Sequence, residues 1–244
     1  MPVDFEWFYY EGVSYDGITE RRPLSFLAQI NCEEASEFDK DNLLPSKGML
    51  YFFYELATMA WGFDPKDKGS SRVYYYPGNI SKLKRTSLPE DLIKEYKLPE
   101  MSIMYSSKNE LPDFEEFIEW HDEYGYDKWN TYDEARKNII PESDDANINK
   151  LLGYANLIQG GMLLNCEETS KGIYTGKPTE ISEDRLQQYK ENCTKWQLLF
   201  QLDSIEYENY ELLWGDVGRI YFYIRIEDLL KLDFENCWLI LQCT

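Results

Sequence analysis

The sequence predicts a β-rich α+β protein made of two related antiparallel sheet units, with helical insertions between them. Three observations support this fold class. Aromatic residues make up 16% of the chain and gather in strand-like runs, which suits pleated surfaces. Two strand patterns, one in each half of the chain, share an order of residue types. A segment of different composition separates these two patterns.

The two strand patterns have one apolar frame in common. Residues 48–54 (GMLYFFY) and 218–225 (GRIYFYIR) each begin at a glycine that closes a turn. In both, apolar side chains occur at every second position, as expected for a strand whose two faces differ. The matching apolar positions are Leu50, Phe52 and Tyr54 in the first pattern and Ile220, Phe222 and Ile224 in the second.

Each pattern has an earlier partner strand that carries a polar pair. The partners are residues 26–31 (FLAQIN) and 198–203 (LLFQLD), and in each a glutamine precedes an asparagine or aspartate by two positions. We interpret this match as an internal duplication within one domain over residues 1–244. Unit one is predicted at about 1–80 and unit two at about 151–244.

Eight segments, which cover most of the chain outside residues 80–150, carry a family resemblance. They are PLSFLAQIN (23–31), LPSKGMLYFFY (44–54), WGFDP (61–65), RVYYY (72–76), LLGY (151–154), IQGGM (158–162), LLFQLDS (198–204) and residues 214–229. In this order they resemble the YwqG-like bacterial proteins, a family of unknown function. The resemblance implies a cytoplasmic, roll-like single domain with internal duplication, and it implies no established activity. The chain departs from the family pattern at Asn149 and Lys150, where a histidine often stands, and at Gly161, where an acidic residue is common.

The segment between the units, about 81–150, is predicted to be an acidic helical elaboration. Residues 90–147 hold 17 acidic and 6 basic residues. One helix is predicted to start at Pro112, and a second is predicted from a capping box that starts at Thr131. A short strand is predicted at residues 101–105.

Unit two contains further predicted elements. Residues 151–164 are interpreted as a turn, a bend and a short strand that ends near Cys166. Ser182 is expected to cap a helix, because acidic residues occupy the turn that follows it. A short helix at residues 226–232 and a final strand at residues 237–243 are predicted to close the fold.

Charge and composition argue against several function classes. The chain has 45 acidic and 25 basic residues, a net charge of −20 at pH 7. This balance disfavours binding to nucleic acid phosphates and to anionic membrane surfaces. No apolar run reaches the length of a transmembrane helix, and the first residues do not form a signal peptide. The five cysteines include no CxxC pair, so we expect buried thiols in a reducing compartment.

No catalytic residue, metal ligand or cofactor is predicted. His121 is the only histidine, and the sequence shows no nucleophile to pair with it. The carboxylates of Asp203, Glu206, Glu208 and Asp216 lack the pattern of a calcium loop and are better explained as a solvated turn.

The polar pairs on the partner strands are open to two interpretations. Each pair is expected on the strand face opposite its apolar neighbours, which are Phe26, Ala28 and Ile30 or Leu198, Phe200 and Leu202. The polar side chains could bond to backbone groups where the two units meet. Alternatively, they line a cleft between the units, with tryptophans as its walls. The candidate cleft residues are Gln29, Asn31, Trp61, Gln201, Asp203, Trp214 and Asp216.

The leading functional hypothesis is a non-enzymatic cytoplasmic protein that binds a basic protein through an acidic face. One form of this function is an immunity protein that masks a basic toxin. The alternatives are a small-molecule-binding protein or enzyme that uses the cleft between the units, and a nucleic-acid mimic. The candidate acidic face consists of Asp113, Glu115, Glu116, Glu119, Asp122, Glu123, Asp144 and Asp145.

Overall fold

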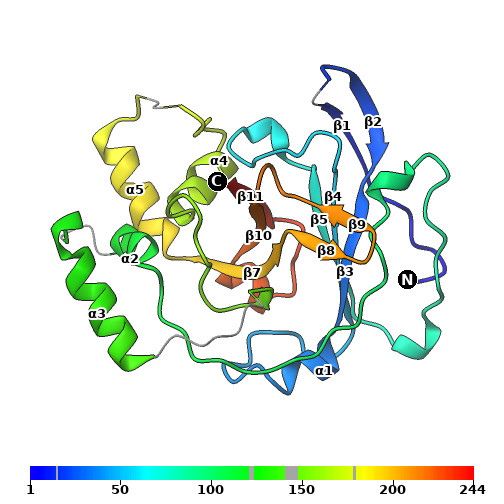
Figure 1. The fold of residues 1–244 in the computed structure, drawn as a ribbon, viewed down its shortest axis with the longest axis horizontal. Coiled ribbons are helices and arrows are strands. Elements are labelled where there is room, and N and C mark those ends of the chain that lie inside the picture. The colour runs from blue at the N-terminus through cyan, green and yellow to red at the C-terminus, as the bar shows by residue number, and fades with distance from the viewer. Residues whose placement is uncertain (15, 121–123, 141–147, 178–179) are drawn as a thin grey trace.

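The computed structural model describes residues 1–14, 16–120, 124–140, 148–177 and 180–244, except for the side chains of residues 118–120. It confirms the predicted α+β class, because antiparallel strands form two main sheets that helices and irregular segments cover (Figure 1). Every helix among the described residues is too short or too polar to cross a membrane.

Sheet one joins three strands in chain order, each antiparallel to the next. They are β3 (Ser25–Asn31), β4 (Met49–Tyr54) and β5 (Ser71–Tyr76). Sheet two has the order β11-β10-β7-β6 and is also antiparallel. Its strands are β6 (Lys150–Leu151), β7 (Trp196–Asp203), β10 (Gly218–Arg225) and β11 (Trp238–Cys243). Two hairpins are separate from these sheets: β1 (Tyr9–Val13) with β2 (Thr19–Pro23), and β8 (Ile205–Tyr207) with β9 (Tyr210–Leu212).

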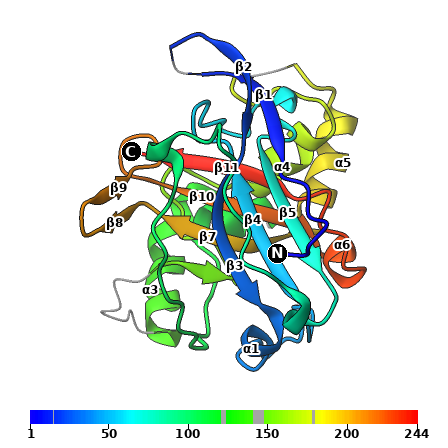
Figure 2. The ribbon, with the colours of Figure 1, turned by 90° about the vertical axis from the view of Figure 1, so that its right-hand side faces the viewer.

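The inner faces of the two sheets pack on each other, and their strands cross steeply (Figure 2). Phe52 of β4 lies at the centre, with its ring centroid 4.5 Å from that of Phe200 and 5.3 Å from that of Phe222. The common apolar frame predicted for the two strand patterns is confirmed as this inner face. Its six members are all fully buried: Leu50, Phe52, Tyr54, Ile220, Phe222 and Ile224.

Different segments cover the two outer faces. The start of the chain places Phe5, Trp7 and Phe8 against Phe53 on the outer face of sheet one. Figure 2 looks onto this face, with the N-terminus in front of the sheet. On sheet two, α4 (Leu163–Ser170) and α5 (Glu183–Cys193) lie on the outer side, at the left of Figure 1. Each sheet therefore buries apolar side chains on both of its faces.

Some of the helices lie where the sequence predicted them. The remaining ones are α1 (Cys32–Ser36), α2 (Phe114–Trp120), α3 (Trp129–Ile139) and α6 (Ile226–Leu230), with 3-10 turns at Pro65–Asp67, Ile80–Lys82, Lys94–Tyr96 and Tyr126–Lys128. The helix predicted after Ser182 is confirmed as α5, and the closing helix and strand are confirmed as α6 and β11.

Four local predictions are wrong. Helix α2 starts at Phe114 and not at Pro112, because its first turn closes with the bond from the N–H of Phe117 to the carbonyl of Asp113. Helix α3 starts at Trp129 and not at Thr131, because a 3-10 turn leads directly into it. Residues 101–105 form no strand, since no sheet edge pairs with them. The strand predicted to end near Cys166 is replaced by helix α4, whose Leu163 and Cys166 lie one turn apart against sheet two.

The two units share register as well as strand order. Gln29 lies opposite Tyr51 in sheet one, and Gln201 lies opposite Tyr221 in sheet two. In each partner strand the register shifts two positions before the glutamine, at a leucine. A β-bulge at the same place in both units supports the internal duplication. The single-domain assignment, with units at about 1–80 and 151–244, stays a prediction.

The bulge corrects one expectation about strand faces. A bulge adds a residue to one strand, so the side chain before it changes face. Phe26 and Leu198 therefore share the outer face with the glutamines, and not the inner face as predicted. Ala28, Ile30, Phe200 and Leu202, which follow the bulges, do contact the inner core.

Candidate functional site

Apolar side chains fill the predicted cleft between the units. Trp214, expected as a wall, is fully buried there and packs against Tyr54, with ring centroids 5.9 Å apart. The two glutamines lie on the outer faces, where Gln29 is exposed and Gln201 is fully buried. The seven candidate residues therefore do not line one cleft.

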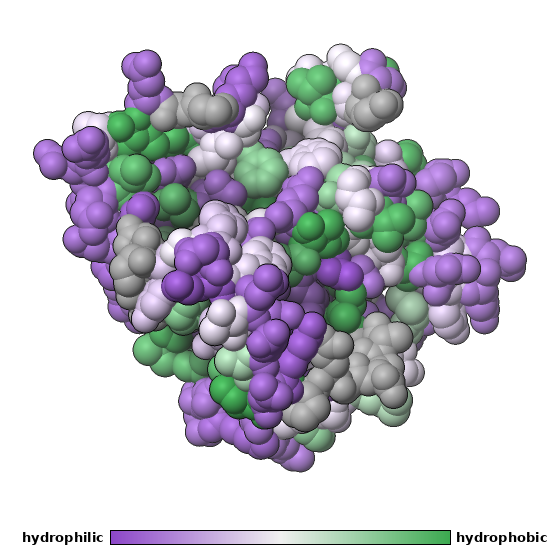
Figure 3. All heavy atoms as spheres, turned by 60° about the vertical axis from the view of Figure 1, so that its left-hand side comes forward, coloured by the Kyte–Doolittle hydropathy of each residue, from purple (hydrophilic) through white to green (hydrophobic). Residues whose placement is uncertain are grey.

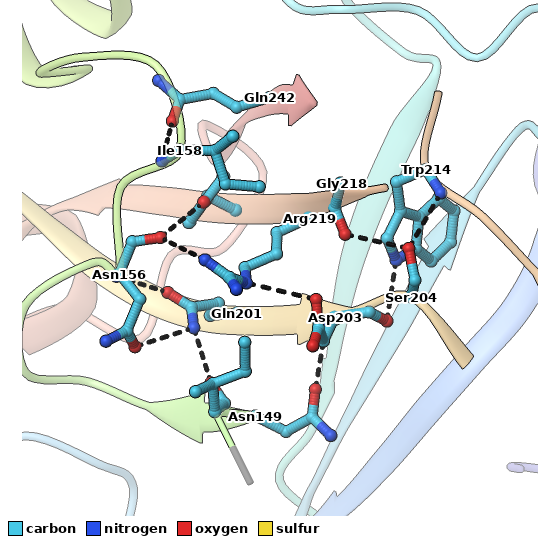
Figure 4. Close-up of polar contacts among 12 residues, drawn as sticks. Asn149, Asn156, Ile158, Gln201, Asp203, Ser204, Trp214, Gly218, Arg219 and Gln242 are labelled. Carbon is cyan, nitrogen blue, oxygen red and sulfur yellow. Dashed lines mark hydrogen bonds and ion pairs between the residues drawn. The ribbon is translucent and has the colours of Figure 1, made fainter. Parts of the chain in front are cut away.

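The other candidate cleft residues have separate local roles. Asn31 caps α1, because its Oδ1 accepts the N–H of Glu33 at 3.2 Å and its Nδ2 donates to Glu34 at 2.7 Å. Trp61 is 40% exposed on a loop, and Asp216 is exposed in the turn before β10. Of the seven, Asp203 and Trp214 are in contact: the indole N–H of Trp214 donates to the carbonyl of Asp203 at 2.8 Å, at the end of β7 (Figure 4).

Gln201 and Tyr221 together hold one asparagine, and we call this pair the Gln201 clamp. Asn156 donates its backbone N–H to Oε1 of Gln201 at 2.8 Å, and its side-chain Oδ1 accepts from Nε2 at 3.0 Å. Its carbonyl oxygen accepts the hydroxyl of Tyr221 at 2.7 Å. Nε2 of Gln201 also donates to the carbonyl of Ile148 at 2.5 Å. The clamp thus binds a whole residue, backbone and amide side chain together.

Further polar side chains fix the same loop to the outer face of sheet two (Figure 4). Arg219 joins Asp203, with Nε 3.1 Å from Oδ1, and donates through a terminal nitrogen to the carbonyl of Asn156 at 3.0 Å. The N–H of Asp203 is bound by Oδ1 of Asn149 at 2.8 Å. Gln242 of β11 accepts the N–H groups of residues 158 and 159 and donates to the carbonyl of residue 160. Residues 148–160 are therefore held along one strand edge and one sheet face.

The polar side chains of this site hold a loop of the same chain. Burial raises the pKa of the Tyr221 hydroxyl above its usual value, so this group stays protonated and serves as a donor. The carboxylate of Asp203 is occupied by Arg219. Each of these buried polar groups therefore already has the partner that burial requires.

Five of the contributing side chains were not among the candidates from the sequence: Asn149, Asn156, Arg219, Tyr221 and Gln242. Asn156 lies in a loop with no motif, and no sequence signal identifies it. Tyr221 and Gln242 could have been found, because each is a polar group on a strand whose neighbours are apolar on both faces. Gln201 does bond to backbone groups, as one interpretation expected, although at an outer face and not where the units meet.

A family model described as a domain of unknown function, DUF1963, matches residues 1–243. The chain belongs to the DUF1963 family. The match covers both sheets and the loop that the Gln201 clamp holds, so the whole site lies within the family's domain. No match to this DUF1963 chain was found among curated proteins.

The candidate acidic face of the DUF1963 chain is only partly exposed. Helix α2 packs against α3 and α5, which turns Glu116 inward, where it is 2% exposed. Asp113 pairs with Arg136, with Oδ2 3.3 Å from the guanidinium, and burial raises the pKa of the nearby Glu115 carboxyl. The described carboxylates of this set therefore do not form one free face. The side chain of Glu119, and Asp122, Glu123, Asp144 and Asp145, lie outside the described residues.

Figure 3 looks onto the side of the molecule with α2, α3 and α5, where hydrophilic residues surround small, separate apolar patches. No group of three or more histidine, cysteine, aspartate or glutamate side chains among the described residues could hold a metal ion. His121 lies outside those residues. Glu206 and Glu208 are exposed on the β8–β9 hairpin, in keeping with a solvated turn.

The cysteines of the DUF1963 chain are free thiols. Four of the five are buried, and none forms a disulfide. Burial raises the pKa of the Cys32 thiol to about 12, so it stays protonated at neutral pH. A protonated, buried thiol is a poor nucleophile.

Helix α1 and the residues directly after it carry a group of exposed carboxylates. Glu33, Glu34 and Glu37 are exposed directly after strand β3, and Asp41 is exposed one turn beyond them. No lysine or arginine among the described residues forms an ion pair with any of these four. This DUF1963 chain therefore has an uncompensated acidic surface at one end of sheet one.

The WGFDP segment of the DUF1963 chain connects the two units. Gly62 has a positive φ of 83°, and a Cβ at this position would lie 1.8 Å from the carbonyl oxygen of Leu239 in β11. The carbonyl of Trp61 accepts the N–H of Leu241 at 3.0 Å, so the loop runs along the outer edge of sheet two. Asp67 closes this loop by accepting the N–H of Gly62 at 2.9 Å. A hollow beside it, lined by residues 67–72, 235 and 237–239, has a volume of about 20 Å³ and holds little more than a water.

Proposed function

We propose that this DUF1963 protein is a non-enzymatic module that binds a basic protein partner through the acidic surface of α1. The observation that carries the proposal is the group of exposed, uncompensated carboxylates at Glu33, Glu34, Glu37 and Asp41. It replaces the α2 segment as the acidic face, because there Glu116 is buried, Asp113 is paired with Arg136 and Glu115 is only partly exposed.

Electrostatics supports this choice of surface. The net charge of −20 attracts a basic partner over a distance and raises the rate of encounter. Carboxylates without an ion-pair partner gain the most electrostatic energy when a lysine or arginine of a partner protein binds next to them. Such pairs are exposed, so salt weakens them strongly.

The narrower expectations remain part of this proposal. We place the protein in the cytoplasm, which its free thiols favour. A YwqG-like character within the DUF1963 family also remains a proposal. An immunity protein that masks a basic toxin is one concrete form of the function, and it requires a toxin gene beside this one.

The test is capture of partners from a native-host lysate by the tagged chain, at low and high salt. We expect one abundant basic protein at low salt, and its loss at high salt. The triple variant E33Q/E34Q/E37Q should reduce capture about tenfold, since each exposed pair contributes only a fraction of a kcal/mol up to about 1 kcal/mol.

The matched control is E206Q/E208Q/E211Q, which removes the same charge from exposed positions on the β8–β9 hairpin. This control should capture the partner as the wild type does. Equal loss in both variants would contradict a specific role for α1, and an absence of any basic partner at low salt would contradict the function itself.

A further inference from the structure

The internal duplication gives the Gln201 clamp a counterpart in unit one. Gln29 and Tyr51 are paired across β3 and β4 in the same register, and at the same distance from the bulge, as Gln201 and Tyr221 across β7 and β10. Both pairs point to the outer face of their sheet. The side chains that hold Asn156 in unit two therefore recur in unit one.

In unit one, these groups bind nothing within the described chain. The amide of Gln29 is exposed and makes no hydrogen bond to a described residue. The hydroxyl of Tyr51 is fully buried and has no hydrogen-bond partner there. A buried hydroxyl without a partner is uncommon, because burial removes its bonds to water. Tyr51 is thus a donor that lacks the acceptor its counterpart Tyr221 has.

The outer edge of β3, beside this pair, has no strand partner among the described residues. In unit two, β6 pairs with β7 at Lys150–Gln201 and Leu151–Phe200, and Asn149 binds the N–H of Asp203. In unit one, β3 is the last strand of its sheet, and no described strand pairs with its outer edge. Residues 148–156, which lie along β7 and on the outer face of sheet two, therefore show which kind of segment could bind at β3.

We propose, building on the proposed function, that Gln29 and Tyr51 form a second clamp that binds an extended segment of the partner protein along β3, with an asparagine placed as Asn156 is in unit two. The amide of Gln29 takes the N–H and the side-chain oxygen of that asparagine. The hydroxyl of Tyr51 donates to its carbonyl oxygen.

The surroundings define this site further. Met49 stands where Arg219 stands in unit two, so the carbonyl of the bound asparagine depends on Tyr51 alone. The half-buried Tyr74 stacks beside Tyr51, with ring centroids 5.9 Å apart, and a turn of this side chain would open the hydroxyl to the ligand. The acidic surface of α1 begins where β3 ends, which favours a basic residue next to the clamped segment.

The probe is a synthetic peptide with the sequence of residues 148–156 of this chain, INKLLGYAN, because this segment occupies the clamp of unit two. Binding to the full-length chain is measured by calorimetry at high salt, where the charge of α1 is screened. We expect saturable binding. Gln29→Ala and Tyr51→Phe should each weaken it about tenfold, since each removes hydrogen bonds but leaves the strands intact.

Two controls separate this site from others. Gln187→Ala, at an exposed position on α5, should bind the peptide as the wild type does. A peptide with alanine at its final position should bind the wild type about tenfold more weakly than the original peptide does. The Gln29→Ala variant should bind this alanine peptide no more weakly than the wild type binds it, because the lost contacts are the same. Equal binding by the wild type, Gln29→Ala and Tyr51→Phe would overturn the proposal, as would an absence of binding by the wild type.

The peptide measurement tests the second clamp separately from the acidic surface of α1. If E33Q/E34Q/E37Q loses the partner while the Gln29 and Tyr51 variants bind the peptide normally, the proposed function stands and the second clamp is wrong. If E33Q/E34Q/E37Q keeps the partner while the clamp variants lose the peptide, the clamp stands and the acidic surface is wrong.

Discussion

At the scale of single residues, Gly62 shows why the WGFDP segment has its sequence. Its φ of 83° is a conformation that side chains disfavour, and a carbonyl oxygen of β11 occupies the place of a Cβ. Any substitution at this position therefore lowers stability for two reasons, the strained backbone conformation and the clash with β11. The glycine serves the contact between a loop of unit one and a strand of unit two.

We expect Gly62→Ala to lower the free energy of unfolding by at least about 2 kcal/mol, measured by urea denaturation. Gly17→Ala is the matched control, because Gly17 has the same φ of 83° and no atom within 4 Å of its added Cβ. It should cost only about 1 kcal/mol. Equal costs for the two variants would mean that the contact with β11 has no effect on stability.

Residue-level prediction from the sequence succeeded where a pattern repeats. The alternation in residues 218–225 identifies the inner face correctly, because period two reports which side chains share a face. It failed at Phe26 and Leu198, since a bulge is set by the pairing of two strands and one strand alone does not reveal it. Asn156 was missed for a related reason: its partners are distant in the sequence.

At the scale of elements, the turn at Pro65–Asp67 combines a structural role with a pH-dependent one. Burial raises the pKa of the Asp67 carboxyl, against the opposing effect of its hydrogen bonds from the N–H groups of Gly62 and Asp64. The folded chain thus keeps this proton at pH values where the unfolded chain, at its ordinary pKa of 3.8, has lost it. Stability from this group falls as pH rises from that value through the raised pKa.

We therefore expect the free energy of unfolding of Asp67→Asn, relative to that of the wild type, to be higher at neutral pH than near pH 4. The reason is that the amide cannot lose the proton that the carboxyl loses. The measurement is the free energy of unfolding in urea across this pH range. Asp216→Asn, in an exposed turn, is the control for the removal of one carboxylate. A constant difference between Asp67→Asn and the wild type at all pH values would show that the pKa of Asp67 is not raised.

Some helices and strands could be predicted from local sequence signals, and others could not. Helix α5 was predictable, because an acidic first turn after Ser182 is a local signal. Helix α4 was not, since its residues become helical in contact with a sheet that forms from distant segments. The strand predicted at residues 101–105 has suitable residue types, yet a strand requires a neighbouring edge, and residue types do not show which edges are available.

At the scale of the whole molecule, the net charge of −20 opposes compaction as well as attracting partners. We expect added sodium chloride to raise the free energy of unfolding in urea by on the order of 1 kcal/mol, because salt screens the repulsion between carboxylates. The rise should be smaller in E33Q/E34Q/E37Q, which lacks three of the uncompensated charges on α1. A loss of stability on adding salt would show that attraction between opposite charges outweighs this repulsion.

The loop at Trp61–Gly62 has a consequence for the evolution of the chain. Its backbone lies along the outer edge of β11, which would otherwise present unpaired groups to neighbouring molecules. A second half expressed without the first would lose this cover and would tend to aggregate through that edge. Although the two units share strand order and register, the second unit could therefore not be inherited, shuffled or designed without the first.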